Sequence, residues 1–410
     1  MNFTTLKNGI KLIHEPRQGG ITSFCIGFNV GALNEYPNFN IGTAHALEHM
    51  ISKGTKYRSE EEINEIFDNI FGFENAMTNY PYTIYYGSCL TKNIETALKL
   101  YSEILLSPLF PRKDFKSEMD IILEELKEWK GDPNRNCEDT LFMNSFKKRR
   151  IKYPIIGSEE SIKSITIEEV IRFYKCFYNP DNCVISFSSP LDFEVICSLV
   201  EMYFGNWENS SFYLNTESIE FDYEKNISGT YYEKKHNSKA AKIQYIFDIS
   251  NVTFEEFKAL MLFNCAFGEG TSSFLFHEIR TKNAAAYEIG SHIKNENGIK
   301  LLSINMGTSI EKVRKSIDII DNVINEIKNS REYFTKEVIC NLANRIKIKR
   351  ELKIERSIQL CKELTTYQLM YGDFKRFYRE VQGLEKISGK DICYVISKVL
   401  NNPSIQVVES

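Results

Sequence analysis

The alternation of apolar and polar residues predicts a half-buried strand near the start of the chain, between Thr22 and Val30. A strand places every second side chain on the same face, and four apolar residues share one face here: Phe24, Ile26, Phe28 and Val30. We predict further strands at 3–6 and 10–15, around an Asn8-Gly9 turn, and at 82–90 and 182–189. The first half of the chain is therefore expected to contain a sheet.

Apolar residues spaced three and four apart predict helices between these strands. Ser59 and Glu62 form a capping-box pattern at the start of one helix, and residues 72–81 then lead into the strand at 82–90. Further helices are expected at 93–106, 113–130, 138–147, 167–176 and 191–203.

The second half of the chain repeats this order of elements. We predict strands at 230–236, 241–248, 286–294 and 299–307, accompanied by several long helices, and a polar stretch at 208–229 separates the halves. The expected fold is an α+β protein with two homologous domains, each an antiparallel-rich sheet packed with helices. Their predicted bounds are 1–207 and 230–410, with 208–229 as the linker.

Composition narrows the possible classes of partner. The 410 residues are 42% hydrophobic and 26% charged, with a net charge of −4, so no nucleic-acid partner is expected. We find no apolar signal core and no membrane-spanning stretch, which predicts a cytoplasmic protein without a membrane partner. The ten cysteines form no Cys-x-x-Cys pair, and this argues against a disulfide framework or a thiolate zinc site.

The main candidate chemistry lies in the His45-Ala46-Leu47-Glu48-His49 segment. On a helix, His45, Glu48 and His49 project from one face, so the two imidazoles are expected to bind one zinc ion. Glu48 then stands where a general base would act on water. The alternative is an amphipathic helix with surface histidines. The other four histidines have no partner at ligand spacing and are predicted to be structural or surface groups.

A third zinc ligand is expected on the helix at 113–130. Glu125 has apolar neighbours at 121, 122 and 129, so we predict that it faces inward, whereas Glu124 has charged neighbours and should face water. A core-facing carboxylate is costly unless it is paired or binds metal, which favours Glu125. Glu118 lies two turns earlier on the same face, where it can support a ligating histidine.

The stretch from His45 to Glu125 resembles the inverzincin metallopeptidases of the pitrilysin/insulinase family, in particular the half-size members similar to mitochondrial processing peptidase subunits. The 76 positions between His49 and Glu125 match the family's spacing to its third ligand. The resemblance implies one Zn²⁺ per chain and a supporting role for Glu118. It also implies that Asn75, Ala76 and Met77 pair with the substrate backbone as an edge strand.

The segment from Gly270 to Tyr287 resembles the region of active family members that carries an arginine and a tyrosine seven residues apart. These fall on Arg280 and Tyr287, and the resemblance implies that both bind substrate and stabilise the oxyanion of the transition state. The basic, glycine-containing turn that the family often has between them is replaced here by Lys282-Asn283-Ala284-Ala285-Ala286.

The sequence therefore predicts a zinc-dependent endopeptidase that hydrolyses peptides or unfolded polypeptides. The resemblance implies two subunits around an enclosed chamber, as a homodimer or as a heterodimer with a related subunit. Two alternatives stay open: a maturation protease that removes the leader of a ribosomally made peptide, and a non-catalytic chamber or docking subunit.

Overall fold

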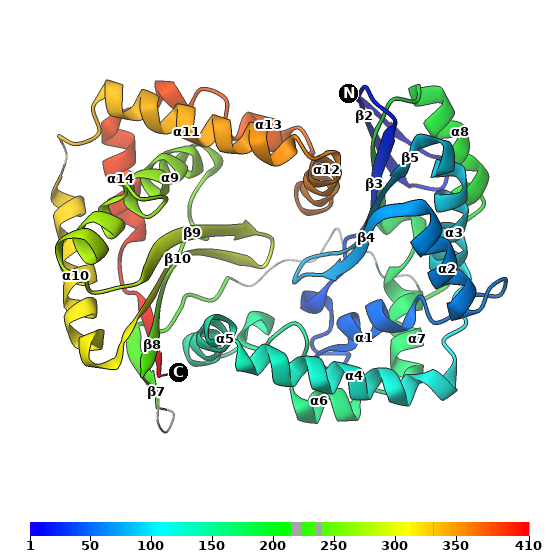
Figure 1. The fold of residues 1–410 in the computed structure, drawn as a ribbon, viewed down its shortest axis with the longest axis horizontal. Helices are drawn as coiled ribbons and strands as arrows, with labels where there is room; N and C mark the ends of the chain where they lie inside the picture. Colours follow the sequence, from blue (N-terminus) through cyan, green and yellow to red (C-terminus); the bar gives the residue numbers. More distant parts are fainter. Residues whose placement is uncertain (213, 215–222, 235–238, 331, 410) are drawn as a thin grey trace. The chain divides into compact units, whose positions relative to one another are not determined.

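The computed structural model describes residues 1–212, 214, 223–234, 239–330 and 332–409. These residues form two compact units (Figure 1). Unit 1 contains residues 1–126, 154–220 and 352–377, and unit 2 contains residues 127–153, 221–351 and 378–410. Part of the predicted linker, at 213 and 215–222, lies outside the described residues, as does His236. Residues 127–153, from the first half of the sequence, therefore belong to unit 2, and residues 352–377, from the second half, belong to unit 1.

Unit 1 is built on a six-stranded mixed sheet with the order β1-β2-β6-β3-β5-β4. The strand β3 pairs antiparallel with β5 and β6, whereas β2 runs parallel to β6. Among the described residues, the strand β4 pairs only with β5, which makes it an edge strand of this sheet. The strand bounds are β1 Asn2–Thr5, β2 Lys11–Pro16, β3 Ile21–Phe28, β4 Phe71–Thr78, β5 Thr83–Leu90 and β6 Cys183–Ser189.

The helices of unit 1 pack around this sheet, and α12 contacts β3 and β6 most extensively. Ser59 and Glu62 form the predicted reciprocal cap at the start of α2. The helix bounds are α1 Thr43–Met50, α2 Glu60–Ile70, α3 Ile94–Leu106, α4 Arg112–Gly131, α6 Glu159–Ser164, α7 Ile167–Phe177, α8 Phe193–Phe204 and α12 Ser357–Tyr371. Helix α4 continues into unit 2 after residue 126.

Unit 2 has a five-stranded sheet with the order β7-β11-β8-β10-β9. The strand β7 runs parallel to β11, and the remaining neighbours are antiparallel. This is the order and direction of β2-β6-β3-β5-β4 in unit 1, so the two sheets share one topology. The strand bounds are β7 Gly229–Glu233, β8 Ala240–Asp248, β9 Glu288–Glu296, β10 Ile299–Ser309 and β11 Ser404–Glu409.

One face of the unit 2 sheet forms the apolar core with helices α9, α10, α11 and α14. Alternation in β8 explains this arrangement, because Ile243, Tyr245 and Phe247 all point into that core. Helix α5 packs against β8 and β11. The helix bounds are α5 Pro133–Ser145, α9 Phe254–Phe267, α10 Val313–Asn329, α11 Lys336–Ile354, α13 Arg376–Arg379, on the boundary between the units, and α14 Gly389–Val399.

The predicted fold, a duplicated α+β unit, is confirmed by these two sheets. Several elements differ from the sequence prediction. The strand β11, which lies between β7 and β8 in the unit 2 sheet, and the short helix α6 were not predicted. Residues 71–78 form the strand β4, where the residue pattern predicted a connection and only the family resemblance implied an edge strand, at 75–77. Helix α5 begins at Pro133, five residues before the predicted start, because Asp132 caps the backbone N–H groups of Asn134 and Arg135.

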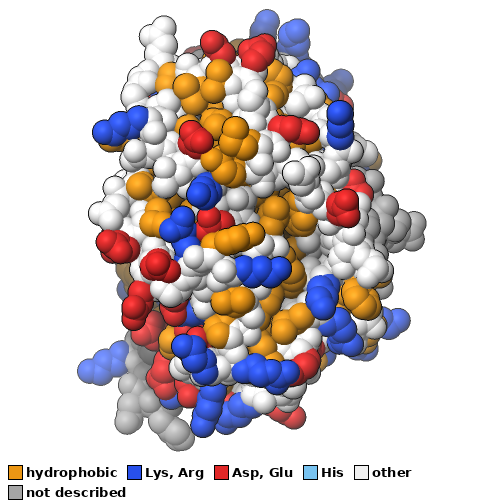
Figure 2. Space-filling model, turned by 90° about the vertical axis from the view of Figure 1, so that its right-hand side faces the viewer, with side chains coloured by type: hydrophobic (Ala, Val, Ile, Leu, Met, Phe, Trp, Pro, Cys, Tyr) orange, Lys and Arg blue, Asp and Glu red, His pale blue; other side chains and the backbone are white. Residues whose placement is uncertain are grey.

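Basic and acidic side chains are intermixed among apolar ones on the face of the molecule shown in Figure 2. This surface pattern agrees with the small net charge of the chain. Within the part of the chain that the structure describes, no helix has both the length and the apolar content needed to cross a membrane.

Candidate metal centre

Helix α1 carries the two histidines, and a buried carboxylate fixes its start. Gly42 precedes the helix with φ +99°, a conformation that favours glycine. The Glu35 side chain is fully buried, and its Oε1 accepts hydrogen bonds from the backbone N–H groups of Gly42 (3.1 Å) and Ala44 (2.9 Å). A carboxylate at this position satisfies otherwise unpaired N–H groups and complements the helix dipole. Glu35 therefore sets where the helix begins.

The structure brings His45, His49 and Glu125 together. Their potential ligand atoms all lie within 4.8 Å of one another. Glu125 Oε2 lies 3.7 Å from His45 Nε2 and 3.4 Å from His49 Nε2. Ligand atoms that surround one zinc ion tetrahedrally at about 2.1 Å stand ~3.4 Å apart. The spacing and the donor set, two imidazoles and a carboxylate, both fit a zinc ion.

The prediction that Glu125 faces inward was wrong. Its side chain is 46% exposed, and Ile121, one turn earlier, is 48% exposed. Glu125 therefore does not face an apolar core. The carboxylate instead points toward the two histidines, with its Oε2 within 3.7 Å of His45 Nε2 and 3.4 Å of His49 Nε2.

Glu118 is buried on the same helix and contacts the other nitrogen of His49. Its Oε2 lies 3.3 Å from His49 Nδ1, and its Oε1 accepts a hydrogen bond from Lys53 Nζ at 2.6 Å. Lys53 also pairs with Glu60 at 2.7 Å. This chain of charges holds the His49 ring in one orientation and leaves Nε2 directed toward Glu125.

The two imidazoles have opposite pKa shifts. Burial, followed by repulsion from His49, lowers the pKa of His45 to about 4. Burial also opposes the charged form of His49, but its contacts with Glu125 and Glu118 outweigh that effect and raise its pKa. Metal binding requires neutral imidazole. His45 is neutral at neutral pH and can bind metal directly. His49 must lose any bound proton before it can bind a metal ion.

Glu48 projects from the same helix and is held by the edge strand β4. Thr78, at the end of β4, donates a hydrogen bond from its hydroxyl to Glu48 Oε2. Burial raises the pKa of Glu48, while this hydrogen bond acts in the opposite direction. A carboxylate whose pKa is raised by burial binds a proton more readily, which suits a group that accepts and then releases a proton.

The residues expected to pair with substrate, Asn75, Ala76 and Met77, lie on β4. Asn75 is exposed, and the other two are partly buried. Within the part of the chain that the structure describes, β4 has a neighbouring strand only on the β5 side, so its other edge carries the backbone groups with which an added strand would pair. The same strand ends at Thr78, so the free edge leads directly to the residue that contacts Glu48.

Arg280 and Tyr287 lie in unit 2, outside the unit that holds the histidines. Arg280 is exposed on a π-helical turn, Phe276–Lys282, and stacks over Phe276 at 5.0 Å. Tyr287 is 51% exposed, and its ring lies against Gly307, where an added Cβ would come within 2.4 Å of the ring. In the turn between them, Ala284 adopts φ +46°, so an alanine here takes a conformation that glycine favours.

Three residues of the site were not predicted from the sequence: Glu35, Lys53 and Thr78. Glu35 precedes the helix by a loop, and Lys53 follows it by a turn, so neither belongs to the helical pattern that revealed the histidines. For Glu35, one signal was available, since Gly42-Thr43 starts a helix without an obvious side-chain cap.

Comparison with known protein families gives two matches along the chain. Residues 16–159 match a family model described as insulinase (peptidase family M16). Residues 164–339 match a model described as the peptidase M16 inactive domain. The first match contains every proposed metal ligand, and the second contains Arg280 and Tyr287.

Individual relatives agree with these matches. The chain is 27% identical to the uncharacterized zinc protease YmxG of Bacillus subtilis, over 94% of this chain and 92% of the relative. It is 32% identical to the mitochondrial-processing peptidase subunit beta of Caenorhabditis elegans, over 49% of this chain and 44% of that protein. A protease from Helicobacter pylori has the same fold, with a TM-score of 0.89 at 20% identity over 100% of this chain and 99% of that one.

Proposed function

The chain belongs to the insulinase family, peptidase family M16, and on that premise we propose that it is a zinc-dependent endopeptidase. The observation that carries the proposal is the convergence of His45, His49 and Glu125 within 4.8 Å. These three residues would hold one Zn²⁺ per chain. Zinc in such a site lowers the pKa of water to about 7 and polarises a substrate carbonyl.

Glu48 would act as the proton carrier of the reaction. Its carboxylate would accept a proton from the attacking water and later deliver it to the nitrogen of the leaving amine. The hydrogen bond from Thr78 holds Oε2 of this carboxylate, so the other oxygen remains for proton transfer. Glu118 would orient His49 through its 3.3 Å contact with Nδ1.

Substrate would bind as an extended peptide along β4, with Asn75, Ala76 and Met77 offering backbone hydrogen bonds at the free edge. Arg280 and Tyr287 would donate hydrogen bonds to the substrate and to the oxyanion of the transition state, a contribution typically worth ~10²–10³ in rate. Both side chains are exposed in unit 2, which leaves their donor groups accessible.

The proposed assembly is a pair of subunits around a peptide chamber, in which Arg280 and Tyr287 of one subunit serve the zinc centre of the other. Since one chain carries both sets of residues, a homodimer would be complete. The Caenorhabditis elegans relative is named as a subunit of a processing peptidase, which supports a related heterodimer as the alternative assembly.

The test combines metal analysis with peptide cleavage. We expect the purified chain to hold one zinc ion and to cleave members of a mixed peptide library. Glu48→Gln should retain zinc and lose cleavage, whereas the matched surface variant Glu124→Gln should retain both. Cleavage that survives in zinc-verified Glu48→Gln would refute the role of Glu48, and zinc without any cleavage by the wild type would favour a docking subunit.

A further inference from the structure

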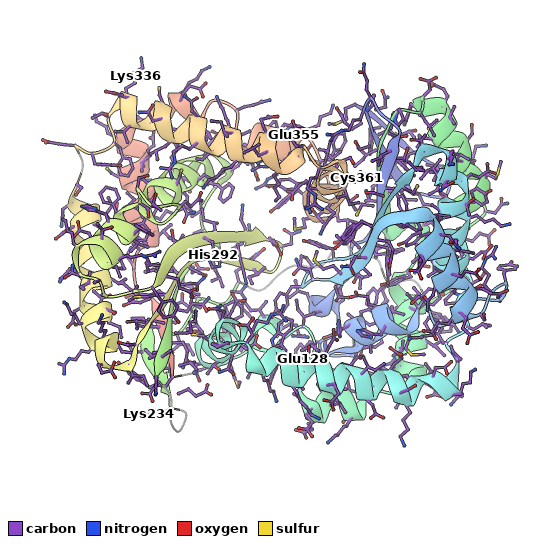
Figure 3. The ribbon with its side chains drawn as sticks, in the orientation of Figure 1. Glu128, Lys234, His292, Lys336, Glu355 and Cys361 are labelled. Atoms are coloured by element: carbon purple, nitrogen blue, oxygen red, sulfur yellow. The ribbon has the colours of Figure 1, made fainter. Side chains whose placement is uncertain are left out.

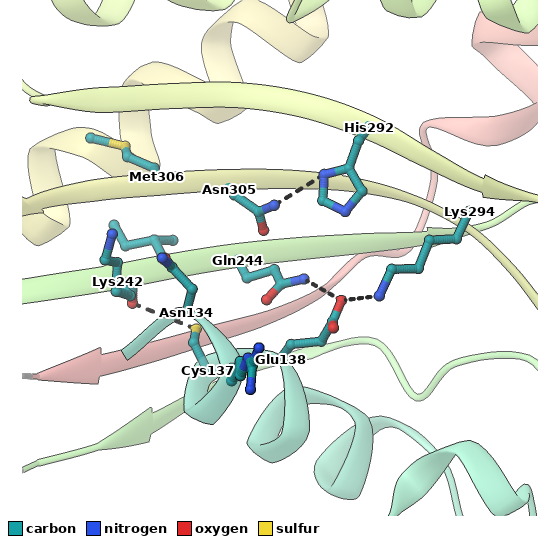
Figure 4. Close-up of a pocket in the computed structure, with 11 residues that line it drawn as sticks. Asn134, Cys137, Glu138, Lys242, Gln244, His292, Lys294, Asn305 and Met306 are labelled. Atoms are coloured by element: carbon teal, nitrogen blue, oxygen red, sulfur yellow. Dashed lines mark hydrogen bonds and ion pairs between the residues drawn. The ribbon is translucent and has the colours of Figure 1, made fainter. Parts of the chain in front are cut away.

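A second polar site lies within unit 2, on the sheet face opposite its apolar core. It is a cavity of about 230 Å³ between the first turns of α5 and the strands β8, β9 and β10 (Figure 4). The alternation of β8 explains its chemistry, because Lys242 and Gln244 point away from the core. Both are nonetheless buried, at 8% and 4% exposure. Buried polar side chains of this kind need partners.

The charges that line this pocket are mainly positive. Arg135, Lys242 and Lys294 provide three cations, and Glu138 provides the one lining carboxylate. Glu138 is already engaged, because its Oε1 accepts from Lys294 Nζ at 2.6 Å and from Gln244 Nε2 at 3.5 Å. The cavity thus offers more hydrogen-bond donors than acceptors.

Two carboxylates at the margin also contact these cations. Glu288 pairs with Lys242, and Asp132 lies 3.7 Å from Arg135 Nε. Neither margin residue lines the cavity, and their side chains are 48% and 43% exposed. An ammonium group has three N–H donors and a guanidinium has five, so each cation keeps donors for a ligand.

His292 adds a neutral donor. It projects from β9 (Figure 3) into the pocket, and its Nδ1 accepts a hydrogen bond from Asn305 Nδ2 at 3.0 Å. Burial, followed by the nearby Lys294, lowers the pKa of His292. The ring is therefore neutral with its proton on Nε2, and this nitrogen has no hydrogen-bond partner among the residues that the structure describes.

The pocket adjoins Tyr287 through a shared residue. Lys242 lines the cavity, and its Nζ also lies 5.3 Å from the centre of the Tyr287 ring. Tyr287 directly precedes Glu288, the first residue of β9, and the pocket residues His292 and Lys294 lie further along the same strand. A peptide that contacts Tyr287 would thus have a neighbouring group within reach of the cavity.

We propose that this pocket is a substrate subsite that binds a carboxylate of the peptide, with Lys294 and His292 as its principal donors. The inference rests on the proposed peptidase function and specifies its substrate class, peptides with a negative charge near the scissile bond. The carboxylate has two possible sources, an acidic side chain or the peptide's C-terminus.

The first experiment measures kcat/KM for matched peptides. One set carries a single Glu or Gln at successive positions, and a second set compares free-acid with amidated C-termini. We expect at least one position where the anionic peptide is cleaved about tenfold faster, the effect of one charge-assisted hydrogen bond. A preference for Glu identifies the side chain, and a preference for the free acid identifies the C-terminus. Equal rates throughout both sets would overturn the proposal.

Two variants that remove charges of opposite sign from the pocket separate an effect on substrate recognition from an effect on folding. Lys294→Gln should remove most of the preference for the anionic peptide, whereas Glu138→Gln should increase it. Lys300→Gln, on β10 but outside the pocket lining, should change neither. Loss of the preference in both pocket variants would show only a structural disturbance and would count against the assignment.

Binding to zinc-free protein distinguishes failure of the subsite from failure of the proposed function. We expect calorimetry to show that the zinc-free full chain binds the preferred anionic peptide about tenfold more tightly than its neutral counterpart. If the zinc-free chain prefers the anionic peptide but the zinc-loaded protein cleaves nothing, the subsite is supported and the peptidase function is rejected. If the protein cleaves peptides but neither binding nor rate distinguishes the anionic from the neutral peptide, the peptidase function is supported and the subsite is rejected.

Discussion

The hydroxyl of Thr78 donates a hydrogen bond to the carboxylate of Glu48, which joins the end of the edge strand β4 to the helix that carries the histidines. The strand proposed to receive substrate and the proposed general base are therefore mechanically coupled. A peptide added along β4 would be positioned by the same element that orients Glu48.

This coupling predicts that Thr78→Val lowers kcat about tenfold and leaves KM little changed, because the substituted side chain keeps its shape but no longer orients the base. Thr78→Ser keeps the hydroxyl and should stay within about threefold of the wild type. Steady-state kinetics on zinc-verified protein measure both. Wild-type kcat in the valine variant would show that the hydrogen bond does not position Glu48.

Zinc retention should depend on Glu125 far more than on Glu124. Glu125→Gln replaces a carboxylate that lies 3.4 Å from His49 and 3.7 Å from His45. Mutation of residues that only support a metal ligand typically weakens metal affinity about 10–100-fold, so loss of an anionic ligand itself should weaken zinc binding by at least that much. Competition with a chelator, read by metal analysis, measures the affinity. Equal affinities for the two variants would exclude Glu125 as a ligand.

The sequence predicted the local part of this site and missed the part that depends on tertiary structure. His45, Glu48 and His49 are four residues apart or fewer, so helical geometry alone brings them together. Glu125 was chosen for apolar neighbours, yet Ile121 is 48% exposed; the spacing shared with the family was the better guide. Thr78 reaches Glu48 only because β4 pairs with β5 in one register, and residues 71–78 lack the alternation that would have revealed that strand.

The fold shows the same limit. The sequence predicted a strand at 241–248, but not that helix α5 covers the polar face of this strand, β8. The residues of α5 that line the pocket come from a segment more than 100 positions away in the chain. The unit boundaries likewise depend on contacts, since residues 127–153 pack in unit 2 although they belong to the first half of the sequence.

Glu35 should be required for stability because its carboxylate accepts hydrogen bonds from two backbone N–H groups at the start of α1. Glu35→Gln weakens the hydrogen bonds to the N–H groups of Gly42 and Ala44 and removes the charge that faces the helix dipole. We expect a loss of about 1–3 kcal/mol in the free energy of unfolding. Urea denaturation measures this quantity, and the exposed Glu61→Gln on α2 is the matched control. A Glu35 variant as stable as the control would show that the cap contributes nothing.

Asp139 should make the stability of the protein depend on pH. Its Oδ2 accepts a hydrogen bond from Trp129 Nε1 at 2.7 Å, but burial raises the pKa of Asp139 to about 6. An acid whose pKa is raised in the folded state binds its proton more tightly there than in the unfolded chain. Its contribution to stability is therefore lost as pH rises from about 4 to about 6.

Asp139→Asn removes this titration and retains an oxygen that can accept from Trp129. The variant should match the wild type near pH 4 and become more stable by up to about 2–3 kcal/mol at pH 7 and above, the free energy that corresponds to a shift of about two pKa units. Urea denaturation followed by circular dichroism across this range measures the difference. The exposed Asp120→Asn on α4 should show no such trend, and a difference at Asp139 that stays constant or shrinks with rising pH would contradict the raised pKa.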